Sequence, residues 1–194
     1  MDARIATKSR KTNETDIRVS LNLDGKGDHQ IATGIPFFDH MLAQIARHGH
    51  LDLEIEAKGD LEIDGHHTVE DVGWVLGQAL REALGDRRGI VRFGHAYVPL
   101  DEALTRVVID LSGRPYLVYK AEFKSPRIGD LQTELIEEFL KALVQEGRFN
   151  LHVENLYGRN QHHIAETIFK ATARALYTAT RVEHAQIPST KGVL

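Results

Sequence analysis

The chain is 194 residues long, 42% of them hydrophobic, and it carries a formal net charge of -4 with acidic and basic residues well mixed. This composition is typical of a folded protein of one or two units, and the mixed charge gives no reason to expect nucleic acid or an anionic membrane as a partner. The sequence contains no Cys, which excludes disulfides, thiolate metal sites and Cys nucleophiles and leaves His and carboxylate side chains as the strong metal ligands.

Hydrophobic periodicity in the first half predicts two strands and two helices. Apolar residues alternate with polar ones over Ile17–Leu23, which predicts a strand. A helix is predicted over Pro36–Gly49, because proline is favoured in a first helical turn and His48-Gly49 stops the pattern. Alternation returns over Leu51–Ala57, and the helical period predicts a second helix from about His66 to Leu84.

The second half shows a similar order, with three predicted strands and two predicted helices. The predicted elements are strands over 107–111, 117–123 and 149–153, a helix over 131–145 that ends before Gly147, and a helix from Gln161 to about Thr180. Sliding one half onto the other by 96 to 98 residues matches Gly49 with Gly147 and Ala79-Leu80 with Ala175-Leu176.

This correspondence predicts an internally duplicated α+β protein. Each half is expected to be a β-β-α-β-α unit of two layers, with helices packed on one face of a mixed four-stranded sheet. The predicted repeats are residues 1–92 and residues 93–194, the second including a C-terminal tail. Because a unit of about 90 residues buries limited apolar surface alone, we expect the two to pack helix to helix into one compact body.

Two further features concern location. No apolar run approaches the roughly 18 residues of a membrane span, so we expect no membrane contact. The residues after Met1 lack the apolar stretch of a signal peptide, which favours the cytoplasm.

The most informative motif occurs twice, at the starts of the second predicted helix of each half. A His-His dipeptide followed three residues later by Glu is a metal-ligand spacing, and the two copies are in register. The copies are Asp64-Gly65-His66-His67-Thr68-Val69-Glu70 and Asn160-Gln161-His162-His163-Ile164-Ala165-Glu166.

On a helix successive residues point about 100° apart, so His66 and His67 cannot easily converge on one ion. Each motif is therefore interpreted as two half-sites that face different directions and need a second element to close them. This geometry favours two metal ions and ligand donation across interfaces. The alternative interpretation is that the paired histidines only cap the start of a helix. Two copies in register make this interpretation less favoured.

Two residues on the preceding helices are further candidate ligands. His40, in Phe38-Asp39-His40-Met41, precedes the first motif, and Glu138 stands at the matching place in the second half. Imidazole and carboxylate without sulfur suit Mn, Fe, Co, Ni or Zn. The alternatives are a polar His on an amphipathic helix and a solvated Glu-Glu pair.

Several motifs in order resemble the imidazoleglycerol-phosphate dehydratases of histidine biosynthesis. The resemblance covers essentially the whole chain and implies removal of water from imidazole glycerol phosphate to give imidazole acetol phosphate, by a hydro-lyase. The motifs that carry it are Gly34-Ile35-Pro36-Phe37-Phe38-Asp39-His40-Met41-Leu42, the two His-His motifs, and Ile187-Pro188-Ser189-Thr190-Lys191-Gly192-Val193-Leu194.

The resemblance also implies a metal centre and an assembly. It implies two Mn²⁺ ions per active site and twenty-four identical subunits, with the sites formed between them. One ion is then held by His40, His67, His162 and Glu166, and the other by His66, Glu70, Glu138 and His163. Glu138 stands where many relatives carry His, and a Glu there would make the second site harder and more negative.

The remaining site residues are also carried over from the resemblance. Glu14 matches a substrate-contacting carboxylate and is expected to shuttle the proton, with Glu70 and Glu166 as further catalytic carboxylates. Substrate and phosphate contacts are expected from Arg92, Arg114, Ser189 and Lys191. Guanidinium, ammonium and hydroxyl donors suit a phosphate dianion. Without the resemblance, a solvated terminus and a surface Glu14 would be favoured.

Two other classes of protein are compatible with the ligand set alone. A di-metal hydrolase would act on generic phosphoesters, and a metal-storing or metal-stapled assembly would turn over no substrate. The predicted phosphate contacts argue against storage, which needs no phosphate cradle.

Overall fold

The computed structural model describes residues 3–183 and 185–192, and the ends of the predicted repeats at 1–2 and 193–194 lie outside this range together with residue 184. The first half contains three strands, a helix, a fourth strand and a second helix. These elements are β1 (Ile5–Lys11), β2 (Thr15–Asn22), β3 (His29–Ala32), α1 (Pro36–Gly49), β4 (Asp52–Gly59) and α2 (His66–Leu84).

The second half has the same order with one small hairpin added. Its elements are β5 (Phe93–Leu100), β6 (Ala103–Asp110), β7 (Tyr116–Lys120), β8 (Arg127–Ile128), β9 (Leu131–Gln132), α3 (Leu135–Gly147), β10 (Asn150–Tyr157) and α4 (Gln161–Thr180). The added hairpin is β8–β9, which connects β7 to α3.

The two four-stranded sheets have the same topology. The strand orders are β1-β2-β4-β3 and β5-β6-β10-β7. In each sheet the last strand is parallel to its neighbour and the other pairs are antiparallel, so both sheets are mixed as expected. The two sheets therefore share one strand order, and the internal duplication with its division at residue 92 stays a prediction.

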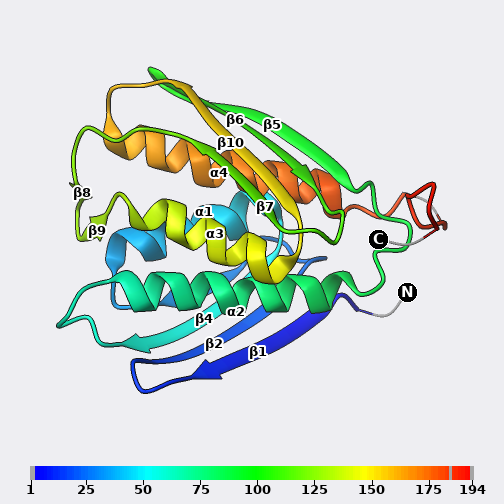
Figure 1. Cartoon of the computed structure of the whole chain (residues 1–194), viewed down its shortest axis with the longest axis horizontal. Helices are drawn as coiled ribbons and strands as arrows, with labels where there is room; N and C mark the ends of the chain where they lie inside the picture. The colour runs from blue at the N-terminus through cyan, green and yellow to red at the C-terminus, as the bar shows by residue number, and fades with distance from the viewer. Residues whose placement is uncertain (1–2, 184, 193–194) are drawn as a thin grey trace.

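The helices lie between the two sheets (Figure 1). Alternating side chains of β2 and β4, such as Ile17 and Ile55, are fully buried, because one face of each strand points at the helices. Helix α2 packs on α3 and α1 packs on α4, which joins the halves helix to helix. The ring of Phe139 contacts Phe38 edge-on at 5.2 Å and stacks on Phe169 at 5.6 Å, so one aromatic group links three helices. The predicted α+β class is confirmed.

The predicted β-β-α-β-α order lacks one strand of the four-stranded sheet in each half, and it also lacks the β8–β9 hairpin of the second half. The missed strands include β1 and β5, which are sheet edges where few side chains are buried, so their apolar alternation is weak. The strand predicted over 117–123 ends at Lys120. The helix predicted from Leu131 begins at Leu135, because Leu131 is buried as part of the β8–β9 hairpin.

Within the described residues, none of the helices has the length and apolar character needed to cross a membrane.

Candidate active site

Both His-His motifs lie at helix N-termini, as predicted. Helix α2 begins at His66, and α4 begins at Gln161 after Asn160, whose side chain accepts hydrogen bonds from the backbone N–H groups of His162 at 3.0 Å and His163 at 3.4 Å. Adjacent rings are nearly perpendicular, with interplanar angles of 89° in the first motif and 81° in the second. The two histidines of each motif therefore face different surroundings.

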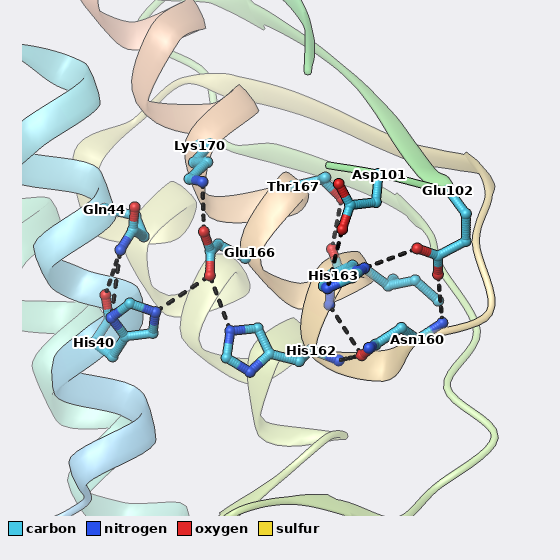
Figure 2. Close-up of polar contacts among 11 residues, drawn as sticks. His40, Gln44, Asp101, Glu102, Asn160, His162, His163, Glu166, Thr167 and Lys170 are labelled. Carbon is cyan, nitrogen blue, oxygen red and sulfur yellow. Dashed lines mark hydrogen bonds and ion pairs between the residues drawn. The ribbon is translucent and has the colours of Figure 1, made fainter. Parts of the chain in front are cut away.

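Three predicted ligands converge where α1 meets α4. The Nε2 atoms of His40 and His162 lie 3.2 and 2.9 Å from the same oxygen, Oε2 of Glu166. Figure 2 shows both rings directed at this carboxylate. One ligand atom from each residue lies within 4.8 Å of the others, which is a separation that one cation can bridge. Phe37 packs edge-on against His162 at a ring distance of 5.1 Å.

The Glu166 carboxylate is ionised at neutral pH. Burial by itself raises the pKa of Glu166, but hydrogen bonds from Lys170, His162 and His40 outweigh burial and lower that pKa to about 2. Lys170 pairs with the second oxygen, Oε1, and leaves Oε2 to face the two imidazoles. An anionic oxygen beside two imidazole nitrogens, without sulfur, fits a first-row divalent cation such as Mn²⁺.

Glu14 and His67 lie together in a second location. Oε2 of Glu14, in the β1–β2 turn, is 3.9 Å from Nδ1 of His67. The same nitrogen lies 3.0 Å from Asp60, and this hydrogen bond raises the pKa of His67. The turn is tied to α2, because the Thr15 hydroxyl donates to the buried carboxylate of Asp71.

The other predicted ligands are dispersed within the described part of the chain. His66 Nε2 is 3.9 Å from Oε2 of Glu70 on the same helix face. Glu138 lies on α3 and pairs with Lys141 at 3.3 Å. His163 points away from His162, and its Nδ1 lies 2.7 Å from Glu102 (Figure 2). One chain therefore assembles three of the four ligands predicted for one ion, and His67 lies elsewhere.

The four predicted phosphate contacts line one cavity of about 740 Å³. Arg92, Arg114, Ser189 and Lys191 share this cavity with Ser112, Gly113, Pro188 and Thr190. The guanidinium of Arg92 donates to Asp110 at 2.7 Å and to the carbonyl of Pro188 at 2.8 Å, so it holds the tail against the β6–β7 turn. The cavity thus carries two guanidinium groups and an ammonium, the donor set that a phosphate favours.

Sequence reasoning missed three residues that contact the predicted ligands. Lys170 is four residues after Glu166 on α4, a spacing that signals a helical ion pair. Asp60 and Glu102 contact the second histidine of each motif. Glu102 is 61 residues from His163, and no local pattern indicates that contact.

Comparison with known proteins gives one consistent result. The family model described as imidazoleglycerol-phosphate dehydratase matches residues 33–176. The imidazoleglycerol-phosphate dehydratase of Magnetococcus marinus is 61% identical over 195 residues, with 99% of this chain and 98% of that protein covered. The protein of the same name from Thioalkalivibrio sulfidiphilus is 58% identical over 197 residues, with 100% of both chains covered.

Solved structures of similar proteins agree with the sequence comparison. The imidazoleglycerol-phosphate dehydratase from Staphylococcus aureus has a TM-score of 0.84 at 41% identity, covering 92% of this chain and 99% of that one. The structure of the Pyrococcus furiosus protein, in complex with (S)-C348, has a TM-score of 0.84 at 38% identity, covering 96% of this chain and 100% of that one.

Proposed function

Because the chain belongs to the imidazoleglycerol-phosphate dehydratase family, we propose that it works with two Mn²⁺ ions in each active site and that these sites form between copies of the chain. Its activity removes water from imidazole glycerol phosphate to give imidazole acetol phosphate in histidine biosynthesis. The observation that carries the metal proposal is the convergence of His40, His162 and Glu166 in one chain.

The reaction explains why such a site needs cations. The proton that leaves is on a carbinol carbon with no carbonyl beside it, so the imidazole ring must supply the electrons that expel the neighbouring hydroxyl. The electron-poor ring system that results acidifies the next C–H, and proton loss there gives an enol that relaxes to the ketone. When bound, the divalent ions would polarise and orient the imidazole ring as Lewis acids.

The side chains fall into three roles, which are metal binding, proton transfer and phosphate binding. His40, His162 and Glu166 would hold one ion with His67, and Glu70 and Glu138 would hold the other with His66 and His163. Glu14 is a half-exposed carboxylate 3.9 Å from a predicted ligand, which suits a proton shuttle. The Arg92 cavity would bind the phosphate.

The positions of these groups support a site shared between copies. The histidine cluster is at the N-terminus of α4, whereas the phosphate cavity adjoins its C-terminus, where the backbone N–H of Arg92 donates to the carbonyl of Ala179 at 2.9 Å. Twenty helical residues span about 30 Å, which the three-carbon chain of the substrate cannot bridge. A second chain is needed to bring a phosphate cavity to a histidine cluster.

The test is turnover of imidazole glycerol phosphate by purified protein stripped with a chelator, with and without added Mn²⁺. Ketone product is expected only with Mn²⁺. Equal turnover in the stripped protein would overturn the metal proposal. Metal uptake without product would favour storage, and hydrolysis of generic phosphoesters would favour the hydrolase.

We expect Mn²⁺ binding and activity to fall together below about pH 6, because imidazole must be neutral to bind a metal and its ordinary pKa is about 6.5. The hydrogen bond that His67 donates to Asp60 raises the pKa of His67, so this ring keeps its proton to a higher pH in the metal-free protein. Competition by protons should therefore begin at a higher pH for His67 than for an unperturbed histidine. Metal content after dialysis across this range measures the effect, and full occupancy at about pH 5 would contradict the His ligands.

The subunit number, the cellular location and the binding partner belong to the same proposal. We expect twenty-four subunits, a cytoplasmic location, and imidazole glycerol phosphate as the partner in place of nucleic acid. Light scattering of the Mn²⁺-loaded protein measures the size of the assembly.

A further inference from the structure

The second histidine of each motif has the same kind of contact. Nδ1 of His67 lies 3.0 and 3.2 Å from the two oxygens of Asp60, and Nδ1 of His163 lies 2.7 Å from Glu102. A carboxylate beside Nδ1 accepts a hydrogen bond from the Nδ1–H group, so the lone pair of the neutral imidazole is on Nε2.

Glu102 is held through its carboxylate, and Asp60 through its backbone. Oε1 of Glu102 accepts hydrogen bonds from the backbone N–H groups of Asn160 at 2.7 Å and Arg159 at 3.1 Å, which fixes it at the start of α4. The backbone N–H of Asp60 donates to the carbonyl of Glu14 at 3.1 Å, and the Asp60 side chain is only 14% exposed. Oε2 of Glu102 faces Nδ1 of His163, and both carboxylate oxygens of Asp60 face Nδ1 of His67.

The two halves reach this contact by different routes. Asp60 directly follows β4, and the residue 96 positions later is Leu156, which has no carboxylate. Glu102 is in the β5–β6 turn, whose topological counterpart is the β1–β2 turn that carries Glu14. The same chemical arrangement at His67 and His163 is thus built from non-equivalent positions.

We propose that Asp60 and Glu102 are positioning residues that hold the Nδ1–H of His67 and His163, so that each ring presents Nε2 to a divalent cation. This inference rests on the proposed Mn²⁺ dependence. It also assigns different roles to Glu14 and Glu102, which occupy corresponding turns of the two halves. In the second half, Glu102 of the turn accepts the hydrogen bond from His163. In the first half, Asp60 accepts the hydrogen bond from His67, so the turn carboxylate Glu14, which is 56% exposed, is left to transfer a proton.

The test is Mn²⁺ affinity of the full chain, measured by titration without substrate. Asp60→Asn and Glu102→Gln should each weaken binding by about 10- to 100-fold, because an amide can donate to Nδ1 and stabilise the wrong tautomer. Glu62→Gln removes the same charge from an exposed position in the loop of Asp60 and should change affinity by less than about fivefold. Equal losses in Asp60→Asn and Glu62→Gln would overturn the proposal.

A double-mutant cycle separates positioning from a general structural role. If Asp60 acts through His67, adding Asp60→Asn to His67→Ala should weaken Mn²⁺ binding no further. Additive losses would overturn the assignment. Unchanged binding in Asp60→Asn, with Mn²⁺ bound by the unmodified chain, would remove only this inference, whereas an unmodified chain that binds no Mn²⁺ would remove the metal proposal as well.

Discussion

Replacing Glu166 by Gln is expected to weaken Mn²⁺ binding by at least about 100-fold and to reduce turnover in parallel, since loss of an outer-shell partner alone costs about 10- to 100-fold. Oε2 of this carboxylate is the atom that His40 and His162 share, and its negative charge is held at neutral pH by Lys170 and the two imidazoles. The amide keeps the shape and removes the charge. Mn²⁺ titration and steady-state turnover measure the two effects.

Glu56→Gln is a suitable control for Glu166→Gln. Glu56 is an exposed carboxylate on β4, so its replacement removes one negative charge away from the histidine cluster. Metal affinity and turnover should stay close to those of the unmodified protein. Full Mn²⁺ affinity in the Glu166→Gln variant would show that Glu166 is not a ligand.

Replacing Glu14 by Gln is expected to lower kcat by about 10²- to 10⁴-fold while metal content and KM change little. The reason is the position of Glu14. Its carboxylate is half exposed and close to His67, and the turn that carries it is anchored through Thr15 to the buried Asp71. The glutamine side chain keeps these surroundings and cannot take up the proton. Steady-state kinetics on Mn²⁺-loaded protein separate kcat from KM.

Asp16→Asn provides the matched control on the same hairpin. Asp16 is 52% exposed and pairs with Lys11 at 2.7 Å, so the variant removes a neighbouring charge without touching the His67 surroundings. It should keep nearly full turnover. Unchanged kcat in Glu14→Gln would exclude Glu14 from proton transfer, and lost metal in that variant would assign Glu14 a role in binding.

The parts of the site that could be predicted from residues alone are those set by local helix geometry. His162 and Glu166 are four residues apart on α4, and that spacing places them on one face of the helix in any fold. The divergence of His162 from His163 follows from the same geometry. By contrast, the phosphate contacts came only from the family resemblance, because Arg92 and Lys191 share no periodicity and meet where the tail folds back on the β6–β7 turn.

The sequence by itself determined the four helices and the strands with a clear buried face, because apolar periodicity and the residues at helix ends are local properties. It also determined the types of ligand, because the composition contains no Cys. It missed the β8–β9 hairpin and the edge strands β1, β3 and β5, in which at most one residue per strand is buried. Only the tertiary structure decided that His40 meets Glu166 and that Glu102 meets His163. These contacts join residues that are 126 and 61 positions apart in the sequence. They depend on how the helices pack and how the strands pair, and both are set by which apolar faces are buried together in the folded chain.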